Sequence, residues 1–216
     1  GAVKKVFHNV AIGEVWLAGG QSNMEFELQH ERKGAAALAS CYSENVRFYY
    51  TPKCSMLGDE LEQAEKESCW RTPSPDNAKA WSAVGYYFAR ELSRRLGVTV
   101  GIIGCNWGGS SASAWISRDY LSCDKRLSPY LDEYDEAIKG KSDEEMIAEY
   151  DEYSTYQWAW EQRMIKFCAE NPGAKWDEVL KNCGENRYPG PHSIKNPMRP
   201  CGLHETMVKR IAPYTL

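Results

Sequence analysis

Three short apolar segments along the chain predict buried β-strands. They are Ile12–Gly20, Asn45–Tyr50 and Val98–Gly104, and the first and third end in glycines, which favour sharp turns. Between the second and third segments, Ser82–Leu96 carries apolar residues at helical spacing, and Gly97 stands where a C-cap glycine belongs. Strands that alternate with helices indicate parallel βαβ units and a three-layer α/β/α fold.

The predicted helix over Ser82–Leu96 has one apolar face, while its charged residues lie elsewhere. That face is formed by Val84, Tyr87, Phe88, Leu92 and Leu96. Active sites of parallel α/β sheets lie at the carboxyl ends of the strands. We therefore expect the two glycine-rich loops, Gly19–Asn23 and Gly104–Ser111, to be neighbours on one rim of the sheet.

The second half of the chain has a different character. Asp132–Glu170 is acidic and aromatic with few turn residues, which predicts one or two long helices, and the Asn-Pro-Gly run at 171–173 ends the second. Trp176–Asn182 predicts a short helix, and the prolines of Tyr188–Pro200 predict an extended loop. Leu203–Ile211 is a predicted amphipathic helix, with these side chains inward: Met207, Val208 and Ile211.

Composition narrows the function classes. The 216 residues are 43% hydrophobic and 26% charged, and 30 acidic against 26 basic side chains give a net charge of -4. Such a chain has no basic field to attract a phosphate backbone, so we expect no nucleic-acid partner. No apolar run is long enough to span a bilayer, so we expect no membrane segment.

The eight cysteines are scattered along the chain without any C-x-x-C pair. Structural zinc is therefore not expected. Thiols spaced in this way behave as small hydrophobic side chains, which favours a reducing, cytoplasmic compartment, while a secreted or periplasmic location stays open. The first eight residues lack the charged start and apolar stretch of a signal peptide.

The most informative run follows the first predicted strand, at Gly19–Glu25. A serine held at a tight turn after a buried strand exposes its hydroxyl at the sheet rim, which is the setting of a nucleophile. The alternative is structural, because Ser22 followed three residues later by Glu25 also fits a helix capping box. The local pattern alone leaves both interpretations open.

The longer run Val15–Glu25 closely resembles the nucleophile block of the sialate O-acetylesterase family, part of the SGNH hydrolase superfamily. Further blocks resemble the family in the same order: Trp81–Ala89, Val100–Ser110, Ala114–Ile116, Leu203–Met207 and the strand entry Ile211–Leu216. The resemblance implies an α/β, three-layer SGNH-hydrolase-like domain with a parallel central sheet. We expect one partial domain over residues 1–216, truncated at its C-terminal side, with a helical insertion at about 132–182.

The resemblance implies a serine esterase that removes O-acetyl groups from sugars, sialic acid above all. Such a mechanism requires no metal and no cofactor, so we expect neither. Ser22 would attack the acetyl carbonyl and form an acyl-enzyme, while the backbone amides of Ser22 and Gly109 would face the oxyanion. Gln21 and Asn23 are candidates to brace the turn or touch the O-acetylated sugar. Trp107 either packs against a sugar face or anchors its loop, and the glycines beside it either serve the oxyanion or form a turn.

A serine hydrolase also needs a general base, normally a histidine oriented by a carboxylate. The chain has four histidines, and none has an aspartate three residues earlier, as the family's Asp-x-x-His block would have. Glu27 and His30 come nearest, and their spacing predicts an outward-pointing helical pair. We hypothesise that the chain is the N-terminal part of a longer esterase whose base lies beyond Leu216.

Other function classes stay open. The absent base and the aromatic density of Tyr150–Trp160 are compatible with an inactive carbohydrate-binding or interaction module, although aromatics at helical spacing are more often core. A thiol nucleophile at Cys105 is a weaker alternative, since a cysteine at a strand end is usually buried. The sequence has no large apolar surface stretch that would support a lipase. An open sheet edge would favour a homo-oligomer.

Overall fold

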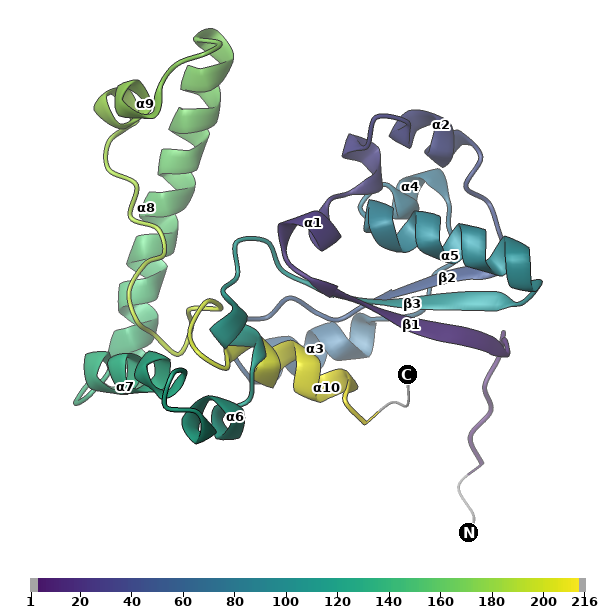
Figure 1. Cartoon of the computed structure of the whole chain (residues 1–216), viewed down its shortest axis with the longest axis horizontal. Coiled ribbons are helices and arrows are strands. Elements are labelled where there is room, and N and C mark those ends of the chain that lie inside the picture. The colour runs from purple at the N-terminus through teal and green to yellow at the C-terminus, as the bar shows by residue number, and fades with distance from the viewer. Residues whose placement is uncertain (1–3, 214–216) are drawn as a thin grey trace. The chain divides into compact units, whose positions relative to one another are not determined.

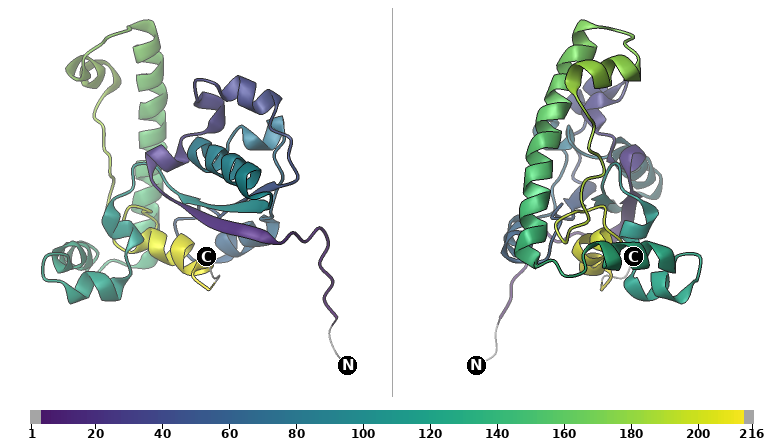
Figure 2. Two further views of the ribbon diagram at one scale, coloured as in Figure 1. Left: turned by 45° about the vertical axis from the view of Figure 1, so that its right-hand side comes forward. Right: turned by 90° about the vertical axis from the view of Figure 1, so that its left-hand side faces the viewer.

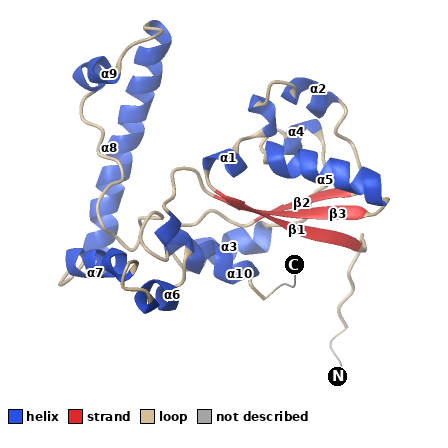
Figure 3. Cartoon of the chain, viewed as in Figure 1, coloured by secondary structure: helices blue, strands red, loops and turns tan. Residues whose placement is uncertain are grey.

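A parallel sheet of three strands organises the first part of the chain (Figures 1 and 3). The computed structural model describes residues 4–213. β1 (Gly13–Gly20) and β2 (Val46–Tyr50) both pair in parallel with β3 (Thr99–Asn106), which lies between them and is buried along almost its whole length. The three predicted strands are confirmed, and β3 runs two residues further than the sequence pattern indicated. The predicted burial of the first strand is wrong, because β1 lies at an edge of the sheet and Ala18 alone of its eight residues is buried.

Helices cover both faces of this sheet. α5 (Ala83–Leu96) lies on one face, and α3 (Asp59–Glu67) and α10 (Lys209–Ile211) lie on the other (Figures 1 and 2). Nε of Arg210 in α10 donates a hydrogen bond of 2.6 Å to the Glu65 carboxylate in α3, which joins the two helices of that layer. The predicted three-layer α/β/α fold with a parallel central sheet is therefore confirmed.

α5 has the predicted ends but not the predicted inner face. Its N-cap is Ser82, whose Oγ accepts the Gly85 N–H at 3.1 Å, and its C-cap is Gly97 with φ +69°. The expected apolar face is largely exposed, by 51% at Val84, 41% at Phe88 and 54% at Leu96. The buried positions are instead Ala83, Gly85, Tyr86, Ala89 and Ser93.

Glycine explains this rotation of α5. A Cβ at Gly85 would lie 3.0 Å from the Phe48 ring of β2, so the missing side chain lets helix and sheet approach closely. Phe48 also stacks on Trp81 at a centroid distance of 4.8 Å. Tyr86, 1% exposed, fills the space beside them. The close packing of α5 on the sheet thus stabilises the fold more than burial of Val84, Phe88 and Leu96 would.

Several short helices were not indicated by the sequence pattern. They are α2 (Gly34–Ala39), α4 (Pro75–Ala78) and a 3₁₀ turn at Leu28–His30, whereas α1 (Ser22–Glu25) lies where the capping-box interpretation had placed a helix. Helices of one turn have no periodicity to detect and are marginal without tertiary contacts. The predicted amphipathic helix at 203–211 is confirmed as a π-helical turn, His204–Val208, that leads into α10. Tyr214–Leu216 of the expected strand entry at Ile211–Leu216 lie outside the described residues.

The chain separates into two compact units. The first comprises residues up to Ser110 and those from Met207 onward, and the second comprises Ser111–Thr206. The second unit is helical, with α6 (Arg118–Cys123), α7 (Ser128–Ala137), α8 (Asp143–Glu170) and α9 (Trp176–Cys183). One or two long helices were predicted over 132–170, and two are present, although α7 begins four residues earlier than predicted. The organisation as one domain with an insertion at about 132–182 stays a prediction.

Packing in the second unit centres on the long helix α8. A capping box of Ser142 and Glu145 begins it, and Trp160 is buried against Val179 and Cys183 of α9. The Trp160 indole donates a hydrogen bond of 2.7 Å to the Gly184 carbonyl, which satisfies its buried N–H. Among residues 4–213, no helix is at once long and apolar enough to traverse a bilayer.

Gly104 of β3 offers a direct test of packing in the sheet. A Cβ there would lie 2.5 Å from the Tyr50 ring, which is itself held by a hydrogen bond. We expect Gly104→Ala to lower the free energy of unfolding by about 2 kcal/mol, because the ring cannot move freely. Urea denaturation of the two chains measures the difference.

Gly19→Ala is the matched control, since the nearest atom to its added Cβ would be 3.7 Å away. We expect a change below about 0.5 kcal/mol for this variant. Equal losses in the two variants would contradict the assigned contact between Gly104 and Tyr50.

Candidate active site

The turn after β1 carries the candidate nucleophile. Gly20 has φ +148°, and the carbonyl of Gln21 accepts the N–H groups of Met24 and Glu25, both at 2.9 Å. Gln21 is therefore the N-cap of α1, without a side-chain cap bond, and Ser22 is the first helical residue. The capping-box interpretation of Ser22 is wrong. Its side chain is exposed at the rim of the sheet.

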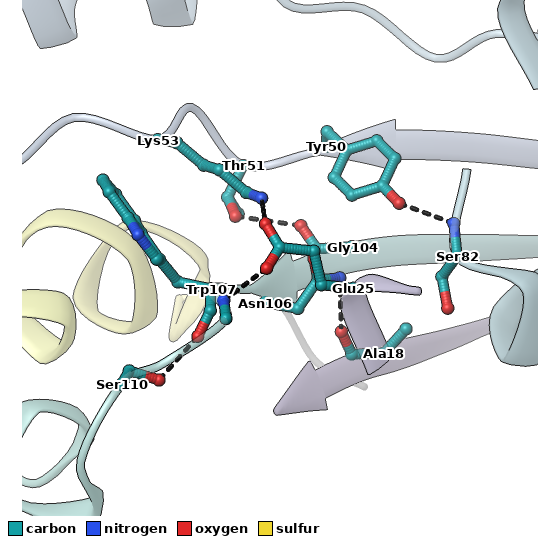
Figure 4. Close-up of polar contacts among 11 residues, drawn as sticks. Ala18, Glu25, Tyr50, Thr51, Lys53, Ser82, Gly104, Asn106, Trp107 and Ser110 are labelled. Carbon is teal, nitrogen blue, oxygen red and sulfur yellow. Dashed lines mark hydrogen bonds and ion pairs between the residues drawn. The ribbon is translucent and has the colours of Figure 1, made fainter. Parts of the chain in front are cut away.

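The carboxylate of Glu25 joins three segments instead of capping the helix. It accepts the backbone N–H of Gly108 with one oxygen and contacts Nζ of Lys53 with the other (Figure 4). A Cβ at Gly108 would overlap this carboxylate and would lie 3.7 Å from Cα of Ser22. Glycine at this position therefore lets the loop after β3 approach the turn that carries Ser22.

The two glycine-rich loops are neighbours, as the sequence indicated. The Trp107 N–H donates to the Gly20 carbonyl at 3.1 Å, which continues the β1–β3 pairing by one residue. Oγ of Ser110 donates to the Trp107 carbonyl at 2.6 Å and closes the loop (Figure 4). Gly109, at the exposed tip, has φ +74°, in the region that favours glycine. The turn interpretation of these glycines is thus confirmed at Gly109, beside the turn that carries Ser22.

The other predicted site residues lie on the same rim. Gln21 and Asn23 are exposed on either side of Ser22, and Trp107 is half-buried. Their roles, and the oxyanion roles of the Ser22 and Gly109 amides, stay predictions.

No histidine is hydrogen-bonded to Ser22 among residues 4–213. His30 contacts Glu27, with Nε2 3.3 Å from the carboxylate, and its side chain is 64% exposed, so the predicted outward pair is confirmed. His8 is exposed before β1. His192 and His204 belong to the second unit, where the His192 ring packs edge-on against Tyr134.

A cavity of about 780 Å³ opens beside the carboxyl end of β2. Its walls include Glu25 after β1, Tyr50 and Lys53 at and after the end of β2, and Asn106 at the end of β3. Sequence reasoning did not find this cavity. The one local signal was Asn106, a polar residue that ends an otherwise apolar strand.

Polar side chains fix the cavity end of β2 against its neighbours. The Tyr50 hydroxyl accepts the Ser82 N–H at 2.7 Å, and Oγ1 of Thr51 donates to the Gly104 carbonyl at 2.9 Å (Figure 4). Burial raises the pKa of the Tyr50 hydroxyl to about 12, because the charged form would lose its hydration. Tyr50 therefore stays protonated at neutral pH and acts as a hydrogen-bonding anchor.

Cys105 does not have the character of a thiol nucleophile. It is 1% exposed, and burial raises the pKa of its thiol to about 11. Reactive cysteines have the opposite properties, a lowered pKa and access to solvent. The interpretation of Cys105 as a buried strand-end residue is confirmed.

With this fold and rim described, the chain can be compared with known proteins. No protein-family model matches it. The sialate O-acetylesterase of Pongo abelii is 29% identical over 128 residues, 54% of this chain and 24% of that protein. The human sialate O-acetylesterase is 28% identical over 123 residues, again 54% of this chain and 24% of its own length. The chain is thus similar to the sialate O-acetylesterases, as its motifs indicated.

One solved structure is also similar. A carbohydrate acetylesterase from Xanthomonas citri is 36% identical, with a TM-score of 0.44, over 51% of this chain and 25% of that one. The chain therefore spans about a quarter of the length of the curated relatives it matches.

The raised pKa of Cys105 predicts slow alkylation of this thiol. At pH 8 only about one thiol in a thousand would be ionised at a pKa near 11, and burial also blocks the reagent. We expect iodoacetamide to label the exposed Cys69 and Cys123 of the native chain and to leave Cys105 unmodified, as read by peptide mass spectrometry. The urea-unfolded chain, in which Cys105 should also react, is the control. Equal labelling of Cys105 and Cys123 in the native chain would contradict the assignment.

Proposed function

We propose that the protein is a serine esterase that removes O-acetyl groups from the hydroxyls of a sugar, with Ser22 as nucleophile. The observation that carries the proposal is the Glu25 carboxylate, which holds the turn bearing Ser22 against the loop Trp107–Ser110. A nucleophile and a loop of backbone donors must be adjacent for acyl transfer. The similarity to proteins named sialate O-acetylesterase supports an acetylated sugar as substrate and makes O-acetylated sialic acid the first one to assay.

In this mechanism, Oγ of Ser22 attacks the acetyl carbonyl while a general base takes its proton. The tetrahedral oxyanion faces the backbone amides of Ser22 and Gly109, each of which would contribute about 3 kcal/mol to transition-state stabilisation. Collapse releases the sugar hydroxyl, which takes up a proton, and leaves an acetyl-serine. Water then hydrolyses this ester and releases acetate. Gln21 and Asn23 would position the sugar, and Trp107 would pack against it.

The general base is a separate part of the proposal. His30 is turned toward Glu27 and solvent, which does not suit a base that must reach the Ser22 hydroxyl. We therefore keep the hypothesis that the base is a histidine beyond Leu216.

A carbohydrate-binding module without catalysis is the second candidate. The observation that favours it is Trp158 on α8, which is 66% exposed within the aromatic stretch Tyr150–Trp160 and could stack on a sugar. Saturable sugar binding by the whole protein, with no release of acetate, would support this candidate over the esterase.

Ser22→Ala tests the esterase directly. We expect the whole protein to release acetate from O-acetylated sialic acid or another O-acetylated sugar, and the variant to lose at least about a thousandfold in kcat, since nothing else supplies the acyl acceptor. Acetate is quantified by a coupled assay or by NMR. The control is Ser40→Ala, which changes a serine that bonds only its own helix carbonyls. Unchanged activity in Ser22→Ala would sink the assignment of the nucleophile.

Glu25 acts through the loop and not on the substrate, so its variants should change kcat more than KM. We expect Glu25→Ala to lower kcat about a hundredfold, because the Gly108 N–H loses its acceptor and the two loops separate. Glu25→Gln keeps an oxygen acceptor for the Gly108 N–H, so its kcat should be about tenfold higher than that of Glu25→Ala.

Lys53→Met tests how much the ion pair between Lys53 and Glu25 contributes to kcat, because it leaves the Glu25–Gly108 hydrogen bond in place. Lys53 and Glu25 are each about one third exposed, so this variant should lower kcat less than about tenfold. Lys139→Met, which removes an exposed pair with Glu136 in the second unit, is the matched control and should leave kcat unchanged. Full kcat in Glu25→Ala would contradict the positioning role.

A further inference from the structure

A second cavity lies at the amino ends of the strands, away from the rim that carries Ser22. Its volume is about 470 Å³, in the range of small-molecule sites. Its walls include Val46, the first residue of β2, and Gly97, the C-cap of α5. Ser22 follows the carboxyl end of β1, and the eight residues of β3 span about 26 Å between the two ends of the sheet. A ligand in this cavity would therefore bind apart from the proposed active site.

Side chains that donate hydrogen bonds line this cavity, and none of the described residues in its wall is acidic. Arg90 and Arg94 come from α5, and Ser43 and Asn45 come from the segment before β2. Oδ1 of Asn45 accepts from Oγ1 of Thr99 at 3.4 Å, so Nδ2 of Asn45 points elsewhere with its two donors. Oγ of Ser43 accepts the Asn45 N–H at 3.2 Å and keeps its own proton to donate. Such a wall favours a ligand rich in acceptors.

Arg90 supplies a positive charge that no carboxylate matches. None of the carboxylates within residues 4–213 forms an ion pair with Arg90. Its guanidinium lies over the Tyr87 ring, 4.9 Å from the centroid, and 5.5 Å from the centroid of Tyr86. Burial raises the pKa of both tyrosine hydroxyls, to about 12 for Tyr87. Both rings are therefore neutral at neutral pH, and they orient the guanidinium without cancelling its charge.

The last turn of α5 adds to the positive charge beside this wall. Arg94 and Arg95 share the carboxylate of Glu91, with N–O distances of 2.8 and 2.6 Å. Cations in the last turn of a helix offset its carbonyls, which accounts for Arg94 and Arg95. Arg90 stands outside that turn, so the helix dipole does not account for it. Glu44, in the segment before β2, is exposed and does not line the cavity.

A phosphate monoester fits these donors better than a carboxylate does. The two guanidinium groups, the amide and the hydroxyl offer more donors than the two oxygens of a carboxylate use, whereas a phosphate monoester presents three oxygens and nearly two negative charges. The planar fork of arginine also matches phosphate geometry. The cavity has room for more than a phosphate group, and Tyr42 in its wall, 72% exposed, offers an aromatic ring to the organic part of an ester.

We propose that this cavity binds a small phosphate monoester. The phosphate oxygens accept hydrogen bonds from Arg90 and Arg94, with further donors from Ser43 and Asn45, and the organic group packs against Tyr42. The site is separate from the proposed ester hydrolysis, and its test does not depend on acetate release.

Binding of phenyl phosphate to the whole protein tests this inference. The comparison ligands are benzoate, which carries one negative charge on the same ring, and phenol, which is neutral. Protein NMR follows each titration in a buffer without phosphate at about pH 7.5, where the ester is doubly charged. We expect phenyl phosphate to saturate the protein with a Kd of about 1 mM or lower and benzoate to bind about tenfold more weakly. Phenol should not saturate the protein.

Variants of α5 assign the binding to Arg90. Arg90→Gln should weaken phenyl phosphate about tenfold, and Arg90→Lys about threefold, because a point charge replaces the bidentate fork. Arg90 is exposed on its helix, so both variants should keep the fold. Arg95→Gln is the matched control, since it removes the same charge from the same helix at a position outside the wall. We expect it to change the Kd less than about twofold.

Vesicles of phosphatidylcholine with phosphatidic acid distinguish a soluble ester from a lipid headgroup. Sedimentation of the protein with these vesicles that is lost in Arg90→Gln identifies the ester as a lipid headgroup, and absence of sedimentation in both chains identifies it as a soluble molecule.

Three results would overturn the inference. They are no saturable binding of phenyl phosphate, binding of phenol as tight as that of phenyl phosphate, and equal weakening in Arg90→Gln and Arg95→Gln, which would indicate a general effect of charge.

Discussion

The contact on which the rim depends is the carboxylate of Glu25 bound to the Gly108 N–H. This carboxylate fixes the segment after β1 to the loop after β3. It also contacts Nζ of Lys53, which joins the segment after β2 to the same two. A charged acceptor on a backbone donor is a strong hydrogen bond, and its second oxygen remains available to a cation. Because Gly108 has no side chain, the carboxylate can reach the backbone directly. The distance between the Ser22 turn and the opposite loop follows from that contact.

Elements with a strong local pattern were predictable from the sequence. The three strands, the caps of α5 at Ser82 and Gly97 and the long helices of the second unit all follow from local chemistry. The inner face of α5 was not predictable, since it depends on how closely Gly85 lets the helix approach Phe48. Periodicity reports which residues share a face, whereas the buried face is decided by the partner surface.

In the candidate site, too, some features could be predicted from local sequence and others depend on distant residues. The neighbouring loops could be deduced from strand order, because parallel strands place their carboxyl ends on one rim. The contact of Glu25 with the Gly108 N–H could not be deduced in this way, since the Ser-x-x-Glu spacing also fits a capping box. The choice between a cap and a bridge depends on Gly108, which lies more than eighty positions away in the sequence. Asn106 was equally hidden, because an unpartnered oxygen is a property of the assembled wall. Long-range polar contacts leave little trace in a single sequence.

The edge of the sheet opposite the cavity has a further consequence. Within residues 4–213, no strand pairs with the outer edge of β1, and Val15 and Leu17 on that strand are partly exposed. An edge strand presents a row of unpaired N–H and C=O groups, so this side is suited to extension by further backbone. The cavity lies on the other side, beside β2. The open edge of β1 and the cavity beside β2 can thus change separately in sequence, and the turn that carries Ser22 adjoins both.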